Sequence, residues 1–253
     1  MSEMNSAIKL FSKGYILNYI VGLLPEENSF DKVAFLFSEK NALTKQRYQK
    51  TKARFLDFLL AGIEIFTAFA LLAFFSPIML LIFLGIKITS NGPGIYSQKR
   101  VGRDSQEFLI YKFRTMVQNA EDKCGAVLSW KGDPRVTRFG NFLRASHLDE
   151  LPQLINIIKR EMSFIGPRPE RQEIIEKFKV NVPGYDQRAV VLPGITGLAQ
   201  ICCPYDASPA QKLKYDLYYI LNKASMTLNL RILLFTVGKM LYGILGDKTQ
   251  SQT

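Results

Sequence analysis

The hydrophobic pattern in the first third of the chain changes from mixed to continuous. Residues 6–24 combine apolar positions with two lysines, which is typical of an interfacial or packing helix too short to span a membrane. A second short helix is expected over residues 30–40, and a basic run covers 45–54. From Ile65 to Ile86 the chain has 22 consecutive uncharged residues. A straight helix of that length measures about 33 Å, enough to cross a hydrocarbon core.

The dipeptide Ser76-Pro77 interrupts this apolar stretch near its middle. Proline removes a backbone hydrogen bond and bends a helix, and a neighbouring serine hydroxyl can satisfy the carbonyl that is freed. Basic residues flank the stretch on both sides, and positive flanks prefer the cytoplasm. We therefore expect a re-entrant helix, broken at Ser76-Pro77, that returns to the face it entered. A kinked transmembrane helix is the alternative.

Beyond residue 94 the pattern becomes that of a water-soluble domain. Alternating positions predict strands at 95–101 and 107–114, joined as a hairpin by a turn-rich segment. The two-residue period places Lys112 and Arg114 on one face of the second strand. Two cations side by side could hold a diphosphate, although a solvated edge has the same spacing. The glycine-punctuated segment 192–200 cannot form a long helix.

These segments predict a helix-rich α/β (α+β) chain in three parts. Residues 1–50 form an N-terminal leader of accessory or interfacial helices, and residues 51–90 form the re-entrant membrane helix. Residues 91–253 form a small mixed catalytic domain that contains the hairpin, a helix near 212–220 and a C-terminal amphipathic helix near 228–245.

Composition narrows the classes of partner. The formal net charge is +11, from 33 Lys and Arg against 22 Asp and Glu, which favours nucleic acid, an acidic membrane face or phosphorylated substrates. Nucleic acid is the least favoured because no recognised binding module accompanies the charge. Three cysteines without zinc-like spacing and a single histidine argue against a disulfide scaffold or a Cys/His metal site. No cleavable signal pattern begins the chain.

Two adjacent carboxylates, Asp149 and Glu150, open a segment that has the pattern of an amphipathic helix. Acidic residues in a first helical turn can serve as ordinary caps, which is the structural alternative to a catalytic role. Arg144 precedes the pair, and Arg168 follows it between two prolines that make a stiff mount for a guanidinium. His147 lies two residues from Asp149 and is expected to point away from it on a helix.

The ordered motifs of the chain resemble those of the bacterial sugar transferase family, the monotopic phosphoglycosyl transferases, from about Arg54 to Leu241. The motifs are Ser76-Pro77, Arg100-Val-Gly-Arg103, Lys112-Phe-Arg-Thr-Met116, Asp133-Pro-Arg-Val-Thr-Arg-Phe-Gly140, Phe142-Leu-Arg144, Leu148-Asp-Glu-Leu-Pro-Gln-Leu154, Met162-Ser-Phe-Ile-Gly-Pro-Arg-Pro169, Pro193-Gly-Ile-Thr-Gly-Leu-Ala-Gln200 and Tyr215-Asp-Leu-Tyr-Tyr219. Each motif alone is weak, whereas so many in this order are specific.

The resemblance implies transfer of a sugar-1-phosphate from a UDP-sugar to a polyprenyl phosphate, such as undecaprenyl phosphate, with release of UMP. It implies that Asp149 is the nucleophile, that Glu150 assists the nucleophile or the metal, and that Mg²⁺, held by Asp149 and Glu150, is required. Lys112, Arg144, Arg168 and Asp216 match positions associated with the site, and Arg114 joins them as a candidate phosphate-binding residue from its strand position.

The resemblance also implies a location, the cytoplasmic face of a bacterial inner membrane, with membrane lipids as partners. The leader and the C-terminal helix are candidates for a homodimer interface.

Two other functions fit parts of the pattern. A membrane-associated glycosyltransferase would move only the sugar and release UDP, and a basic membrane-surface scaffold would have no catalysis.

Overall fold

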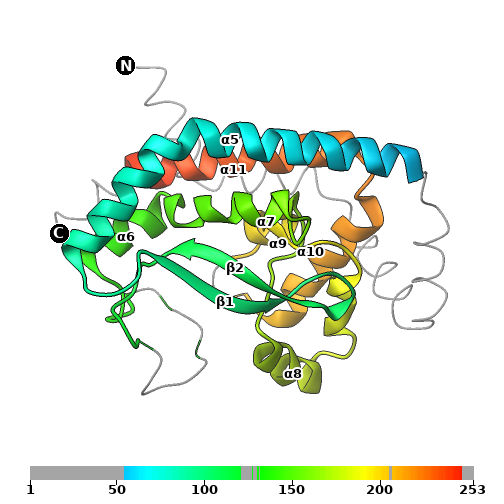
Figure 1. The fold of residues 1–253 in the computed structure, drawn as a ribbon. Coiled ribbons are helices and arrows are strands. Elements are labelled where there is room, and N and C mark those ends of the chain that lie inside the picture. Colours follow the sequence, from blue (N-terminus) through cyan, green and yellow to red (C-terminus); the bar gives the residue numbers. More distant parts are fainter. Residues whose placement is uncertain (1–53, 121–126, 128–129, 131, 205–206, 247–253) are drawn as a thin grey trace.

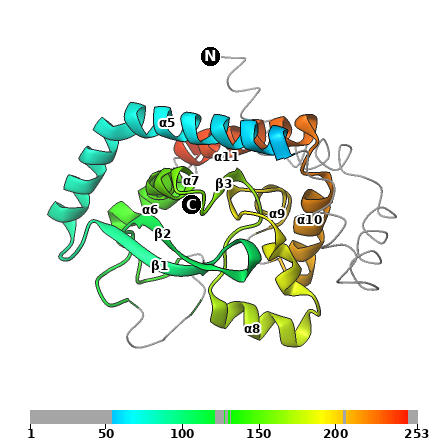
Figure 2. The same ribbon diagram turned by 45° about the vertical axis from the view of Figure 1, so that its right-hand side comes forward.

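A long helix lies across one side of a mixed α/β domain in the computed structural model, which describes residues 54–120, 127, 130, 132–204 and 207–246 (Figure 1). The predictions for the leader, residues 1–50, lie outside these residues. Helix α5 covers Arg54–Thr89, and α11, Met226–Gly246, runs beside it in both ribbon views (Figures 1 and 2). The mixed α/β class expected from the sequence is confirmed.

The other elements follow in chain order. They are β1 (Ile95–Val101), η1 (Arg103–Ser105), β2 (Glu107–Phe113), α6 (Arg138–Ala145), η2 (Leu148–Gln153), α7 (Leu154–Ile158), β3 (Ser163–Ile165), α8 (Gln172–Asn181), η3 (Tyr185–Val190), β4 (Gly194–Thr196), α9 (Leu198–Cys202) and α10 (Pro209–Asn222).

Helix α5 is continuous, with Pro77 inside it, and its ribbon bends toward the C-terminal end (Figures 1 and 2). Pro77 cannot donate a backbone hydrogen bond to the Ala73 carbonyl, and the Ser76 hydroxyl donates to that carbonyl instead at 2.7 Å. This is the compensation that the sequence predicted. The re-entrant path itself stays a prediction.

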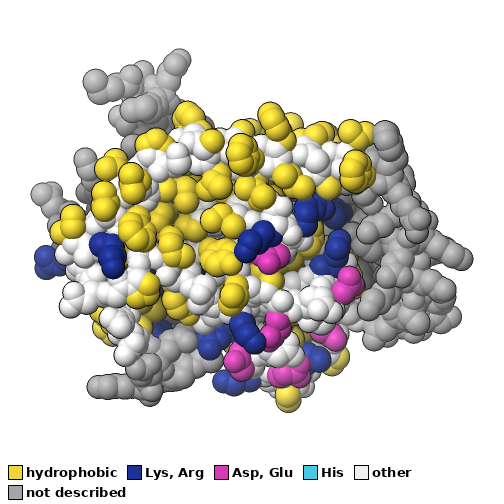
Figure 3. Space-filling view, in the orientation of Figure 1, with side chains coloured by type: hydrophobic (Ala, Val, Ile, Leu, Met, Phe, Trp, Pro, Cys, Tyr) yellow, Lys and Arg dark blue, Asp and Glu magenta, His cyan; other side chains and the backbone are white. Residues whose placement is uncertain are grey.

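The outer side of α5 is apolar. Within the described residues, Phe58–Thr89 is the one helix long and apolar enough to cross a membrane, and only 11% of its most apolar window is buried. Side chains such as Phe66 and Phe74 are about three-quarters exposed, and hydrophobic side chains gather along the upper edge in Figure 3. An exposed apolar surface of this extent is typical of a protein that contacts lipid or another protein.

The predicted hairpin is confirmed. Strands β1 and β2 pair antiparallel from Ile95 opposite Phe113 to Val101 opposite Glu107. A second sheet, not foreseen from the sequence, pairs the three-residue strands β3 and β4 in parallel. In that sheet the Gly166 N–H donates to the Thr196 carbonyl at 2.8 Å.

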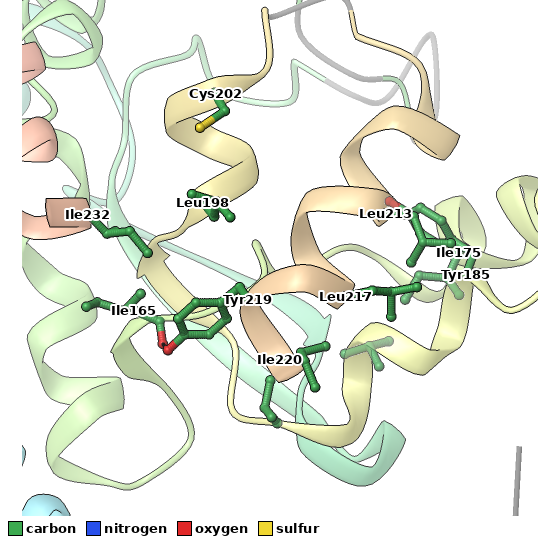
Figure 4. Close-up of a cluster of buried hydrophobic side chains, with 12 residues drawn as sticks. Ile165, Ile175, Tyr185, Leu198, Cys202, Leu213, Leu217, Tyr219, Ile220 and Ile232 are labelled. Atoms are coloured by element: carbon green, nitrogen blue, oxygen red, sulfur yellow. Dashed lines mark hydrogen bonds between the residues drawn. The ribbon is translucent and has the colours of Figure 1, made fainter. Parts of the chain in front are cut away.

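The largest hydrophobic core lies where α8, α9, α10 and η3 pack around the β3–β4 sheet, with Tyr185, Leu217 and Ile220 among its buried side chains (Figure 4). The Tyr219 ring enters this core, and its hydroxyl donates to the Ile165 carbonyl at 3.0 Å. The core therefore fixes β3, and with it the Pro-Arg-Pro segment that follows.

Candidate active site

The two adjacent carboxylates lie on a 3-10 helix rather than at the start of an α-helix. Leu148–Gln153 forms η2, and α7 begins only at Leu154. His147 precedes η2 with φ 56°, a left-handed conformation, so the chain turns sharply between α6 and the carboxylates. The expectation of an α-helix from Asp149 was wrong, because Pro152 and this turn favour a tighter helix.

Glu150 is held by two cations that come from different parts of the chain. The Lys112 ammonium, on β2, donates to Glu150 Oε1 at 2.6 Å, and Arg168 Nη2, in the segment after β3, donates to the same oxygen at 3.0 Å. Burial disfavours ionisation of Glu150, but the two cations outweigh it and hold the pKa of this carboxyl well below its usual range. Glu150 is therefore an ionised carboxylate with fixed partners.

Asp149 has the opposite environment. Its side chain is buried at 8% exposure, and within the described part of the chain its carboxylate forms no hydrogen bond or ion pair. Burial raises the pKa of Asp149 to about 6, and the neighbouring charge of Glu150 acts in the same direction. Lys112, Arg168 and Arg144 oppose that rise. Asp149 thus combines a carboxylate that is not paired within the described residues with cations close enough to act on a ligand beside it.

Arg144 lies within electrostatic reach of Asp149, and its Nε donates to the Thr115 hydroxyl at 2.8 Å. Arg114, in contrast, lies elsewhere. It follows the end of β2 and donates to the Ser90 carbonyl at 2.8 Å and to the Ser90 hydroxyl at 2.7 Å. Its guanidinium packs so closely on Gly92, which has φ +110°, that a side chain there would overlap it. Lys112 and Arg114 therefore do not form the paired cation site that the strand period suggested.

Asp216 belongs to a second polar cluster. Its Oδ2 lies 2.7 Å from Arg188 Nη2, and Arg188 also donates to the Tyr185 hydroxyl at 2.7 Å. Arg188 lies 4.0 Å from Glu170, which follows the Pro-Arg-Pro segment. Asp216 can therefore support the segment that carries Arg168, but within the described residues it takes no part in the contacts of Asp149 and Glu150, the carboxylate dyad. No local pattern marked Arg188, since its two acidic partners, Asp216 and Glu170, are far from it in the sequence.

Two further ionisable residues, His147 and Lys239, interact with the cations that contact Glu150. His147 follows the end of α6, and its ring interacts electrostatically with Glu150, Arg168 and Lys112. Burial lowers the pKa of His147. Lys239, on α11, donates to the Gln200 carbonyl at 3.0 Å and interacts electrostatically with Arg168. The proximity of Lys239 to Arg168 depends on tertiary packing, so periodicity could not reveal it.

A hollow lies beside the Pro-Arg-Pro segment, between the β1–β2 turn, α8 and η3. Both signs of charge line it, with Arg168, Glu170, Lys179, Asp186 and Arg188 among the residues. Mixed charges of this kind suit a polar ligand rich in hydroxyl groups better than an apolar one.

The carboxylate pair fits one way of holding a magnesium ion. Within the described residues no group of three or more His, Cys, Asp and Glu side chains could enclose a metal. Magnesium often takes only one or two protein carboxylates and completes its shell with substrate phosphates and water. Asp149, without a partner of its own, and the adjacent Glu150 match that donor set.

Comparisons with known proteins identify one family. The sequence model of the bacterial sugar transferase family matches residues 55–243. The chain is 42% identical over 189 residues to a UDP-N-acetylgalactosamine-undecaprenyl-phosphate N-acetylgalactosaminephosphotransferase of Aeromonas hydrophila, covering 74% of this chain and 44% of that protein. It is 38% identical over 178 residues to a UDP-glucose:undecaprenyl-phosphate glucose-1-phosphate transferase of Xanthomonas campestris pv. campestris, covering 68% of this chain and 36% of that protein.

A shorter relative is matched over more of its length. A UDP-glucose:undecaprenyl-phosphate glucose-1-phosphate transferase of Caulobacter vibrioides is 37% identical over 184 residues, covering 71% of this chain and 68% of that protein. The chain therefore spans less than half of the first two relatives and about two-thirds of this one.

Proposed function

The chain belongs to the bacterial sugar transferase family, and from this premise we propose that it transfers a sugar-1-phosphate from a UDP-sugar to undecaprenyl phosphate. The observation that carries the proposal is the contrast within the dyad. Asp149 is buried without a partner, while Glu150 beside it is fixed by Lys112 and Arg168. One carboxylate is thus available to react, and the other organises the cations around it.

In the first step an Asp149 oxygen attacks the phosphorus that carries the sugar. The bond from this phosphorus to the bridging oxygen breaks, and UMP leaves with that oxygen and its electron pair. The product on the protein is an acyl phosphodiester between Asp149 and the sugar-1-phosphate. Attack by an anion on a dianionic diphosphate needs nearby positive charge, which Lys112, Arg168 and Arg144 provide.

In the second step an oxygen of undecaprenyl phosphate attacks the same phosphorus. The bond to the Asp149 oxygen breaks, the carboxylate is regenerated, and undecaprenyl-diphospho-sugar forms. Because UMP can leave before the lipid phosphate arrives, one group of cations can serve both steps, and ping-pong kinetics are expected. The apolar outer side of α5 supports a site held at the membrane face, where the lipid phosphate lies.

Magnesium is part of the proposal, with Asp149 and Glu150 as its protein ligands. When bound, the ion would neutralise charge on the diphosphate and polarise its phosphoryl oxygens. Glu150 stays ionised because Lys112 and Arg168 depress its pKa, so it can present a carboxylate oxygen to a cation over the working pH range. We place this site at the cytoplasmic face of the inner membrane, since UDP-sugars are polar substrates of the cytoplasm.

The test is a single-turnover reaction in detergent with Mg²⁺ and no lipid. UDP-N-acetylgalactosamine and UDP-glucose are the first donors to use, since they appear in the names of relatives. Intact-mass spectrometry should show an adduct of one sugar-phosphate, peptide mapping should place it on Asp149, and the released nucleotide should be UMP. Asp149→Asn should give no adduct, whereas the control Asp104→Asn, at an exposed turn, should react normally.

Release of UDP would contradict the proposal and favour the glycosyltransferase alternative, which moves the sugar alone. Normal turnover by Asp149→Asn would exclude this residue as the nucleophile. Addition of undecaprenyl phosphate to the labelled protein should remove the adduct and yield the lipid-linked sugar. An adduct that persists would contradict the proposed second step.

A further inference from the structure

The membrane helix carries one charged side chain in its apolar stretch. Between Phe58 and Ile86, Glu64 is the only ionisable residue of the sequence. A charge in such a helix is costly unless it is paired, and it commonly marks a functional contact. Glu64 faces the soluble domain rather than lipid, since it accepts hydrogen bonds from that domain and is 29% exposed.

Glu64 binds two residues that lie on either side of the α7–β3 turn. Arg160 Nη1 donates to Glu64 Oε2 at 2.8 Å, and the Ser163 hydroxyl donates to Glu64 Oε1. Arg160 has φ 62°, a left-handed conformation that is unusual for a residue with a long side chain. The chain thus adopts an uncommon turn at the place where α7 meets α5 (Figures 1 and 2).

This turn is tied to both cations of the dyad. Ser163 is the first residue of β3, and Arg168 follows five residues later. On the other side of the turn, the fully buried Asn156 donates to the Leu109 carbonyl at 2.7 Å and accepts from the Tyr111 N–H at 3.1 Å. Both residues lie in β2 just before Lys112. One junction therefore links the membrane helix to β2, which carries Lys112, and to β3, which precedes Arg168.

We propose that Glu64 is a positioning residue that fixes the height and tilt of the catalytic domain against the membrane helix, and thereby aligns Arg168 and Lys112 with the phosphate of the lipid acceptor. The proposal rests on the proposed function. It assigns Glu64 to the lipid step specifically, because β3 and β2 are also held within the domain, by β4 and β1. Loss of the Glu64 contacts should leave the dyad assembled but let the domain shift relative to the bilayer.

The reaction can be divided to test this assignment. Asp149 labelling by UDP-sugar uses a soluble substrate and does not depend on the height of the site above the membrane. Transfer to undecaprenyl phosphate does. If Lys112 and Arg168 no longer meet the lipid phosphate at the right height, binding is lost equally in the ground state and the transition state. Glu64→Leu should therefore raise the KM for undecaprenyl phosphate, by about tenfold, and leave kcat nearly unchanged. Labelling of Asp149 and kcat at saturating lipid should stay within about twofold of the unmodified protein.

The experiment uses the full chain in lipid nanodiscs with graded undecaprenyl phosphate. Charge exchange tests the contact directly: Arg160→Glu alone should raise the lipid KM, and the double variant Glu64→Arg with Arg160→Glu should recover most of the loss. Glu107→Gln is the matched control, because it removes the exposed Lys99–Glu107 ion pair on the hairpin and should change nothing. If Glu64→Leu does not fold, Glu64→Gln, which keeps the shape and loses the charge, replaces it with an expected threefold rise.

Three results would overturn the proposal: an unchanged lipid KM in the Glu64 variants, an equal loss in Asp149 labelling and lipid transfer, or no recovery in the charge-exchanged protein. Binding of undecaprenyl phosphate, measured by native mass spectrometry, separates this proposal from the proposed function. A chain that made no product with any donor would refute the function. The positioning role would still be tested by whether Glu64→Leu weakens lipid binding and the double variant restores it.

Discussion

We expect Lys112 and Arg168, the two cations that contact Glu150, to contribute unequally to the free energy of unfolding. The Lys112 ammonium lies 2.6 Å from Glu150 Oε1, and both side chains are mostly buried, at 17% and 11% exposure. At an effective dielectric constant of about 20, that separation corresponds to about 6 kcal/mol of attraction before desolvation is subtracted. Arg168 contacts the same oxygen at 3.0 Å, but 46% of its side chain is exposed, so solvent screens it.

We expect Lys112→Met to lower the free energy of unfolding by about 3 kcal/mol, the lower end for breaking a buried pair, since Arg168 still neutralises Glu150. Arg168→Met should cost about 1 kcal/mol. For a chain of this size these losses correspond to falls in Tm of about 6–12 °C and about 2–4 °C. Thermal unfolding in detergent, without divalent cations or substrate, measures both.

The Glu150→Gln background gives a sharper comparison. With the carboxylate replaced by an amide, the buried ammonium of Lys112 keeps an acceptor but loses the negative charge that neutralised it, so Lys112→Met should now raise Tm instead of lowering it. Equal shifts for Lys112→Met and Arg168→Met would refute the unequal burial. A Lys112→Met effect that is the same in both backgrounds would refute the pairing itself.

Three further outcomes follow from the same structure. Because burial raises the pKa of Asp149 to about 6, its ionisation favours the unfolded state, so this group's stability contribution falls as pH rises from about 4 through 6. Without divalent cations, Asp149→Asn should therefore gain about 3 kcal/mol at pH 8 and little at pH 4, and equal gains would contradict this expectation. Burial raises the pKa values of Cys202 and Cys203 to about 12 and about 11. At pH 8 iodoacetamide should therefore label neither thiol in the folded protein and both in denaturant, which peptide mass spectrometry measures. Ser76→Ala should lower the free energy of unfolding by about 1 kcal/mol. The loss should be smaller in the Pro77→Ala background, because residue 77 then has a backbone N–H that can bond the Ala73 carbonyl. Thermal unfolding with and without Ser76→Ala in each background measures both losses, and equal losses would contradict this expectation.

Local patterns in the sequence were sufficient for the elements that carry them. The β1–β2 hairpin follows from alternation and a polar turn, and the compensation by Ser76 follows from the chemistry of Pro77. The parallel β3–β4 pair gave no such signal, because each strand has only three residues and is followed at once by a glycine. A strand that short shows no period, and its partner lies about thirty residues away in the sequence.

The candidate site shows the same division. Asp149, Glu150, Lys112 and Arg168 stand in ordered motifs, and the structure brings them together. Arg114 was placed with them by extending the strand period one residue too far, since β2 ends at Phe113 and the next side chain turns to Ser90. The assignments of catalytic and metal-binding roles to these residues stay predictions, and labelling experiments will decide them.

The side-chain amide of Asn156 has a consequence for how the protein behaves before it reaches the membrane. A two-stranded sheet has an open edge on each strand, and such an edge can template pairing with another chain. Asn156 occupies part of the outer edge of β2 by bonding the Leu109 carbonyl and the Tyr111 N–H, the two groups that an incoming strand would need. One buried amide thus takes the place of a third strand. A newly made chain that already exposes an apolar helix would be expected to aggregate far more readily if this edge were left open.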